Sequence, residues 1–293
     1  MLQRTIESLA AQAVQPLEII VVDASDNPKT QQICEDGVLG LSSQMRWIKS
    51  LECGAATQRN QGVAVATQSL IWFFDDDILF EPDCVRRLWS AIESDQQLGG
   101  VNAMIVNQRY QMPGAISRFI FTLMHGRAEK TFAGKVIGPA INLLPEDRDD
   151  LPDVVPVEWL NTTCAIYRRE ALPDPPFPEA FVGYSLMEDL ALSLNVAKRG
   201  WRLGNVRTAK IFHDSQPSPH KLDVVAAAAM ELLNRHYVMT QVLERRKAID
   251  YLRLLGWEIF SILSTATTSY GRRNRGFVIQ GKWKALRELR NNC

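Results

Sequence analysis

The apolar residues of the first two hundred positions follow two alternating periods. Short runs rich in β-branched and aromatic residues, typical of buried strands, alternate with segments whose apolar residues recur every three or four positions, as in amphipathic helices. This alternation predicts an α/β fold with a doubly wound, mostly parallel sheet. The strands are expected at 18–23, 45–48, 71–74 and 101–106, and the helices at 1–13, 29–35, 55–66 and 82–89.

The pattern is less regular after this alternation. Proline and glycine interrupt residues 107–155, which predicts a loop-rich insertion able to cover a substrate. Further strands are expected at 157–160, 163–167, 201–203 and 210–213, with one helix between them. Ser185 and Glu188 fit a capping box, with Ser185 as the N-cap and Glu188 at the third helical position, and Gly200 is expected to end this helix.

Only helical periodicity remains beyond Pro219. Long helices are expected at 223–246 and 248–268, followed by a tail in which seven Lys or Arg accompany one Glu. The longest charge-free run there covers 13 residues, 259–271, short of the roughly 20 that span a bilayer. We therefore expect two domains, 1–215 and 216–293. Two interpretations of the second stay open: it lies on an anionic membrane face, or it packs as a helical hairpin on the first domain with a solvated tail.

Composition narrows the class of protein. The 293 residues include 33 basic and 33 acidic side chains, so no overall charge favours nucleic acid as a partner. Five cysteines, an odd number without a C-x-x-C pair, indicate reduced thiols and a cytoplasmic location. The N-terminal residues lack the basic and apolar regions of a signal peptide.

Three consecutive carboxylates, Asp75, Asp76 and Asp77, follow the apolar run from Ile71 to Phe74. In open α/β sheets, ligands bind just beyond the carboxyl ends of strands. Because side chains alternate along an extended chain, Asp75 and Asp77 are expected to point the same way, about 6.6 Å apart, and Asp76 the other way. This arrangement suits one divalent cation, although a solvated acidic turn explains an isolated triplet equally simply.

Five segments together resemble inverting glycosyltransferase family 2, whose fold is called GT-A. They occur in the family's order and cover about residues 1–215. The segments are EIIVVDASD at 18–26, QRNQG at 58–62, FFDDD at 73–77, MEDLAL at 187–192, and Phe212-His213.

The resemblance implies a donor site for a nucleotide-diphosphate sugar with Mn²⁺ or Mg²⁺ as cofactor. Asp75 and Asp77 would hold the metal, and His213, which has a metal-binding counterpart in related GT-A enzymes, would be a third ligand favouring Mn²⁺. For His213 a purely structural role stays open. The donor-binding residues implied are Asp23, Asp26, Arg59, Asn60, Asp76 and Glu188. The alternatives are a turn role for Asp23 and a surface charge for Arg59.

Inverting transfer needs one base for the proton of the acceptor hydroxyl. If Glu188 serves as the capping partner of Ser185, Asp189 is left as the base, and this agrees with the role of the second acid in the family's Glu-Asp pair. Alternatively, both acids only complement the helix dipole.

Two features depart from the family. The strand that normally precedes the first helix is missing, so we expect a start assigned too late, a fragment, or a sheet closed up without that strand. The chain has neither Gln-x-x-Arg-Trp nor a spanning helix, which indicates a non-processive enzyme. The expected acceptor is a hydroxyl of a glycolipid or surface saccharide, reached from the cytoplasm with peripheral membrane contact. A nucleotidyltransferase, or an inactive nucleotide-sugar-binding or membrane-associated scaffold, remains the alternative.

Overall fold

The computed structural model describes residues 1–215 and 223–291, and the chain divides into two compact units. Unit 1 comprises residues 1–110, 133–135 and 143–216. Unit 2 comprises residues 111–132, 136–142 and 217–293. Unit 2 therefore takes in residues from the middle of the chain as well as the C-terminal region.

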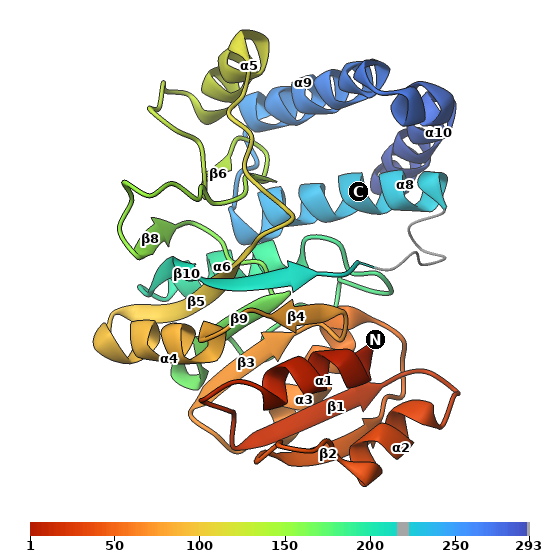
Figure 1. Ribbon diagram of the computed structural model, residues 1–293. Helices are drawn as coiled ribbons and strands as arrows, with labels where there is room; N and C mark the ends of the chain where they lie inside the picture. Colours follow the sequence, from red (N-terminus) through yellow and green to blue (C-terminus); the bar gives the residue numbers. More distant parts are fainter. Residues whose placement is uncertain (216–222, 292–293) are drawn as a thin grey trace. The chain divides into compact units, whose positions relative to one another are not determined.

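Unit 1 confirms the predicted alternation of strands and helices, and Figure 1 shows its helices flanking strands. Its helices are α1 (Leu2–Ala10), α2 (Lys29–Asp36), α3 (Ala55–Val65), α4 (Cys84–Ser94), η1 (Arg169–Ala171) and α6 (Glu188–Lys198). Its strands are β1 (Glu18–Asp23), β2 (Gln44–Lys49), β3 (Leu70–Phe74), β4 (Ile78–Phe80), β5 (Leu98–Ile105), β8 (Val154–Val157), β9 (Cys164–Arg168) and β10 (Arg202–His213).

The strands of unit 1 form two sheets. The larger has the order β3-β9-β5-β10-β4, with β8 also pairing with β10, and only its β5–β10 ladder is parallel. The smaller is the parallel pair β1–β2. The sheet is thus more mixed than the helix–strand alternation suggests, because β9 returns antiparallel between β3 and β5. No ladder joins β1 to β3 in the described residues, so the expectation of a sheet closed up into one is wrong.

One strand replaces two that the sequence predicts. Residues 201–203 and 210–213 were expected as separate strands, but β10 runs continuously over 12 residues. Its pairing with β5 shifts register between Val206 and Lys210, which accommodates the polar residues between the two apolar runs. The continuous strand carries His213 to the end of the sheet where β4 pairs with it.

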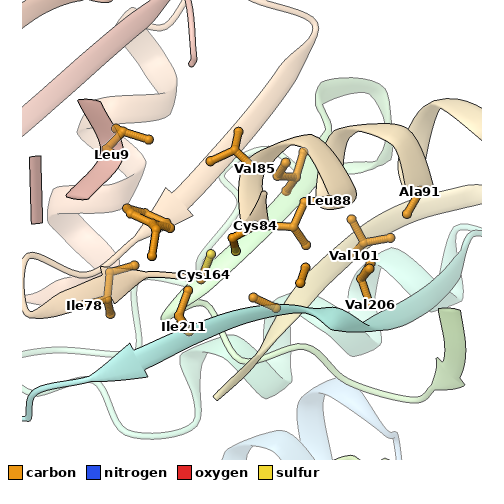
Figure 2. Packing of buried hydrophobic residues seen from close by; sticks show 14 of the residues in the cluster. Leu9, Ile78, Cys84, Val85, Leu88, Ala91, Val101, Cys164, Val206 and Ile211 are labelled. Carbon is orange, nitrogen blue, oxygen red and sulfur yellow. The ribbon is translucent and has the colours of Figure 1, made fainter. Parts of the chain in front are cut away.

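A hydrophobic core under α4 fixes the strand ends of unit 1. Figure 2 shows Leu88 of α4 packed towards Val101 of β5 and Val206 of β10, all fully buried. Leu9 of α1 and Ile78 of β4 belong to the same cluster. Deleting part of such a buried side chain costs about 2–5 kcal/mol, so this cluster holds β4 and the end of β10 firmly together.

Unit 2 is mainly helical. Its helices are α5 (Ala115–His125), α8 (Val224–Tyr237), η2 (Val238–Val242), α9 (Ala248–Ser264), η3 (Thr265–Thr267) and α10 (Ser269–Asn291), and β6 (Val136–Ile137) pairs with β7 (Ile141–Asn142). Two sequence expectations are corrected here. The expected loop over 107–155 contains α5, in which Ile116, Phe119, Ile120 and Leu123 recur at helical spacing. The expected solvated tail is the 23-residue helix α10.

Four charged side chains join the three long helices of unit 2. Arg235 of α8 pairs with Glu231 at 2.6 Å and with Glu258 of α9 at 3.2 Å. Lys282 of α10 lies 2.8 Å from both carboxylates. Arg235, Glu258 and Lys282 are buried. Two cations facing two carboxylates neutralise each other, as buried charges require, and they set the register of α8, α9 and α10.

Two glycines of α10 differ sharply in their surroundings. A Cβ on Gly281 would meet the carbonyl oxygen of Val225 and lie 2.8 Å from the Cβ of Ala228, whereas Gly276 faces open space. We expect Gly281→Ala to separate α8 from α10 and to lower the free energy of unfolding by about 1–3 kcal/mol. Gly276→Ala should raise it by about 0.5–1 kcal/mol, the helix propensity gained over glycine. Denaturant unfolding followed by circular dichroism measures both, and destabilisation by both variants would contradict the packing explanation.

Candidate active site

The ends of β3 and β10 bring three metal-ligating side chains together. Asp75 and Asp77 follow β3, and the antiparallel pairing of His213 with Ile78 places the imidazole beside them. The His213 Nε2 atom lies 3.1 Å from Asp77 Oδ1. One ligand atom from each of Asp75, Asp77 and His213 lies within 4.8 Å of the others, so the group could hold a metal ion. Asp75 and Asp77 thus lie together as expected, but they do so in the turn between β3 and β4 rather than along an extended strand.

Hydrogen bonds of the main chain fix this group. The amide of Asp75 donates to the carbonyl oxygen of Thr163 at 3.1 Å, and the amide of Asp214 donates to that of Asp77 at 2.8 Å. The Thr5 hydroxyl of α1 lies 2.7 Å from the carbonyl oxygen of Asp76 and 2.8 Å from that of Ile78. The acidic turn is therefore held from both sides rather than free in solvent.

Asn107 and Gln108 support His213 from the end of β5. The Asn107 amide donates to the His213 carbonyl oxygen at 2.8 Å and accepts from its amide at 3.1 Å. The Gln108 Nε2 atom lies 3.0 Å from His213 Nδ1. A partner on Nδ1 fixes the orientation of the ring and leaves Nε2 directed at Asp77. Sequence reasoning missed both residues, although their place directly after a predicted strand was an available signal.

The fit to a divalent cation rests on the donor set. Two carboxylates and one imidazole suit Mn²⁺, and carboxylates with water also suit Mg²⁺. All three side chains are partly exposed, so an ion and its remaining waters can reach them. The expected cofactor, Mn²⁺ or Mg²⁺, therefore agrees with the side chains present.

Arg59 of α3 links the metal-ligating group to α6. Its Nη2 atom donates to Asp75 Oδ1 at 2.8 Å, and Nη1 donates to Glu188 Oε1 at 2.6 Å. Its guanidinium also lies 5.7 Å from the ring centre of Phe177. Burial lowers the pKa of Arg59, but the two carboxylates outweigh burial and raise it, so the side chain remains charged. Arg59 is thus not the freely solvated surface charge that the sequence left open.

The prediction of a capping box at the start of α6 is wrong. The helix begins at Glu188, and Met187 before it has a φ of 75°. The Ser185 hydroxyl contacts the carbonyl oxygen of Gly183 at 2.9 Å and the amide of Ala56 at 3.4 Å, instead of capping. Glu188 consequently has no capping partner and turns to Arg59. The assignment of Asp189 as base by elimination of Glu188 therefore loses its premise, and the family resemblance alone supports it.

Asp189 has a strongly perturbed acidity. Burial, followed by the charge of Glu188, raises the pKa of Asp189 to about 8, although its Oδ1 atom accepts a hydrogen bond from the Leu190 amide at 2.7 Å. Burial also raises the pKa of Glu188, against the opposing effect of Arg59. Two neighbouring acids of which only one is paired to a cation differ in environment, a pattern common in catalytic sites.

The side chains expected around the nucleotide have different partners. Asp23 at the end of β1 accepts from the Ser25 amide at 2.8 Å and from Trp47 Nε1 at 3.3 Å. Burial raises its pKa, but these hydrogen bonds outweigh burial and lower it. Asp26 is fully exposed and pairs with Lys49 at 3.2 Å. Their contact with a donor stays a prediction.

Asn60 and Asp76 complete the predicted set. The Asn60 amide donates to the carbonyl oxygen of Phe177 at 2.8 Å and accepts from its amide at 3.0 Å, which ties α3 to the proline-rich loop. Asp76 lies outside the metal-ligating group, as alternation predicts. Burial and then the charges of Asp77 and Asp75 raise its pKa.

The sequence profile described as "Glycosyl transferase family 2" matches residues 1–173. The chain therefore belongs to glycosyl transferase family 2, and the α/β GT-A fold class and the family resemblance are confirmed. No curated protein sequence matches the chain significantly.

Solved structures of GT-A enzymes resemble this fold at low sequence identity. A mannosyltransferase of Pyrobaculum calidifontis, solved with GDP-mannose and Mn²⁺, is 15% identical with a TM-score of 0.52, over 92% of this chain and 79% of that chain. Residues 1–349 of S. aureus TarS are 18% identical with a TM-score of 0.47, over 100% and 88%. GalNAc-T7, solved with UDP, GalNAc and Mn²⁺, is 14% identical with a TM-score of 0.49, over 77% of this chain but only 42% of that chain.

Proposed function

We propose that the protein is a non-processive, inverting glycosyltransferase that moves a sugar from a nucleotide-diphosphate donor to a hydroxyl acceptor. The observation that carries the proposal is the convergence of Asp75, Asp77 and His213 within 4.8 Å, next to a largely buried Arg59 that is 16% exposed. A group of two carboxylates and an imidazole suits a cation that binds a diphosphate. The family membership supports sugar transfer as the chemistry.

Each residue of the site has a distinct part in this reaction. Asp189 accepts the proton of the acceptor hydroxyl as the new bond forms. Asp23, with Asp26 beside it, accepts hydrogen bonds from the nucleoside. Arg59 holds Asp75 and Glu188 in place, and its charge favours the diphosphate. A cation held by Asp75, Asp77 and His213 would stabilise the negative charge of the leaving nucleoside diphosphate.

We propose a glycolipid or a surface-polysaccharide saccharide as the acceptor, with the enzyme peripheral on a membrane face. The basic and apolar helices of unit 2 support this location, and the absence of a Gln-x-x-Arg-Trp motif supports a single transfer. Among the described residues, no helix combines the length and apolarity needed to cross a membrane.

Substitution of the two metal-ligating carboxylates tests the proposed function. We expect Asp75→Asn with Asp77→Asn to lower Mn²⁺-dependent release of nucleoside diphosphate at least about 100-fold, because the neutral amides cannot replace two anionic ligands. Asp36→Asn, an exposed acid at the end of α2, is the control and should keep wild-type activity.

The assay uses uridine, thymidine and guanosine diphosphate sugars, first ranked by the thermal shift that each produces with Mn²⁺. Release that continues in the double variant would remove the metal site from the mechanism. A wild-type protein that binds donors without turning any over would instead support an inactive nucleotide-sugar-binding protein.

A further inference from the structure

The zero net charge of the chain conceals an uneven distribution. The residue ranges of unit 2 hold 16 of the 33 Lys and Arg residues but only 7 of the 33 Asp and Glu residues. Unit 1 holds the remaining 17 basic and 26 acidic residues. Unit 2 is therefore strongly basic, and a partner with negative charge suits it.

Helix α9 of unit 2 carries an exposed aliphatic stripe. Its five members recur at intervals of three or four residues, so they share one side of the helix. The stripe is about 21 Å long at 1.5 Å per residue. It consists of Ile249 (51% exposed), Leu252 (62%), Leu255 (55%), Ile259 (50%) and Leu263 (55%). Half or more of each of these residues is exposed to water, so binding of an apolar partner would bury this apolar area.

The α9 stripe contains no acidic side chain. The two acids of α9 are both buried, and both have partners within unit 2. Asp250 accepts from the Lys247 amide at 3.0 Å, and Glu258 pairs with Lys282. The sequence alone does not separate the two sides of α9, whereas the structure buries both of its acids and exposes the five aliphatic residues of the stripe.

Exposed cations lie at both ends of the α9 stripe. Arg246 and Lys247 directly precede α9, and Arg272 and Arg273 follow it in the first turn of α10, after the short helix η3. All four are exposed. An aliphatic stripe with exposed cations close to it suits the surface of an anionic bilayer, where phosphates attract the cations and acyl chains take up the apolar side chains.

Helix α5 adds a second exposed apolar side within unit 2. Ile116, Phe119 and Leu123 are 77%, 67% and 55% exposed. The helix lies beside α9, since the rings of Phe121 and Trp257 are 6.2 Å apart, and Figure 1 shows the two helices as neighbours. The residues of α5 come from the segment expected as an irregular loop. The exposed apolar surface of unit 2 is therefore larger than the C-terminal helices alone would provide.

We propose that the α9 stripe lies in the interface of an anionic bilayer, with the cations at its ends against the lipid phosphates. The helix would lie in the plane of the membrane, because it is too short and too charged to cross it. A second copy of the chain fits this face poorly, since it would bring a second excess of positive charge against the first. The inference deepens the membrane contact of the proposed function, and vesicle binding tests it without donor or turnover.

Vesicle cosedimentation of the full chain tests the proposal. Wild type should sediment with phosphatidylcholine vesicles that contain about 30% phosphatidylglycerol and should stay in solution with phosphatidylcholine alone. Leu255→Gln with Ile259→Gln and Leu263→Gln should weaken binding at least about 100-fold, since each loses the burial of a large aliphatic side chain. Arg272→Gln with Arg273→Gln should weaken it about fivefold for each cation removed.

The matched control is Leu39→Gln with Leu51→Gln, which replaces two almost fully exposed leucines of unit 1. This control should bind vesicles as wild type does, and circular dichroism should show that all variants are folded. The proposal is overturned if wild type does not bind anionic vesicles, or if the stripe variant binds them with the affinity of wild type. A wild-type dimer in light scattering that becomes monomeric in the stripe variant, without vesicle binding by either, would assign the stripe to a second copy. Because donor hydrolysis is measured separately, failure here leaves the transferase proposal untouched.

Discussion

Asp189→Asn is expected to abolish sugar transfer and, at the same time, to stabilise the folded protein at alkaline pH. The substitution keeps the shape of the side chain but removes the group that takes the proton of the acceptor. A positioned general base contributes about 10²–10⁴-fold to a rate. We therefore expect a loss of turnover of that size, with the affinity for the donor little changed.

The stability effect follows from the raised pKa of Asp189. Its ordinary pKa of 3.8 rises to about 8 in the folded protein, because burial and Glu188 disfavour the charged form. Between these two pH values the folded state holds a proton that the unfolded state lacks. The contribution of Asp189 to the free energy of unfolding therefore falls as pH rises, and its destabilising effect is complete above about pH 8. The side-chain amide of the Asp189→Asn variant carries no charge at any of these pH values, so the variant avoids this cost.

Thermal unfolding between pH 5 and pH 9 measures the effect. The melting temperature of Asp189→Asn should exceed that of wild type by at least about 2 °C at pH 9, the shift that about 1 kcal/mol gives a protein of this size. The difference should shrink towards pH 5. Glu179→Gln, which neutralises an exposed acid of unit 1, should change neither stability nor turnover. Equal melting temperatures at pH 9 would show that Asp189 is not held in a site that disfavours its charge.

The same acidity predicts the pH dependence of wild type. Without donor or cation, Asp189 is protonated at neutral pH and becomes a base only as pH rises through about 8. The value of kcat/KM should therefore increase with pH up to that region. A rate independent of pH between 6 and 8.5 would assign the proton transfer to another group.

The sequence alone was sufficient to predict the structure where a local pattern of residues also carries the function. The apolar run before Asp75 predicted a strand, and the two-residue alternation predicted that Asp75 and Asp77 would share a side without Asp76. The helices α1 to α4 and the strands β1 to β3 were predictable for the same reason, whereas the three-residue strand β4 was not predicted. His213 required the resemblance, because nothing local shows that β10 pairs with β4.

The sequence was insufficient where long-range contacts override local preference. Ser185 is a good N-cap by composition, yet its hydroxyl contacts the main chain of Gly183 and Ala56, and the helix starts three residues later. Glu188 and Asp75 both pair with Arg59, from which they are 129 and 16 positions away in the sequence. No periodicity of the sequence encodes such contacts. Helix α5 was missed because the prolines and glycines around it were given more weight than the helical spacing of Ile116, Phe119, Ile120 and Leu123.

Arg59→Met is expected to be the most destabilising single substitution in the site. The guanidinium pairs with Asp75 and Glu188, and the side chains of Arg59 and Glu188 are only 16% and 12% exposed. Its removal leaves two nearby carboxylates without a cation, and loss of one partner of a buried pair costs about 3–5 kcal/mol. Arg59→Lys should be intermediate, because one ammonium cannot donate in two fixed directions as a guanidinium does.

The control is Arg86→Met, which breaks the exposed ion pair with Asp83 on α4, where the side chains are 49% and 40% exposed. An exposed pair contributes at most about 1 kcal/mol. Denaturant unfolding of both variants should therefore give clearly different losses. Similar losses would mean that the bridge between α3 and α6 carries no more stability than a surface pair.

A double-mutant cycle separates the bridge from the packing of Arg59 on Phe177. If most of the cost of Arg59→Met arises from the unpaired Glu188, then Glu188→Gln should recover part of the stability when added to Arg59→Met, although it destabilises wild type alone. If the cost arises from lost packing, the two substitutions should add. Mn²⁺ gives a second measure, because a cation between the carboxylates replaces the missing charge. It should therefore raise the melting temperature of Arg59→Met more than that of wild type, and no rise in either protein would argue against a metal site at Asp75.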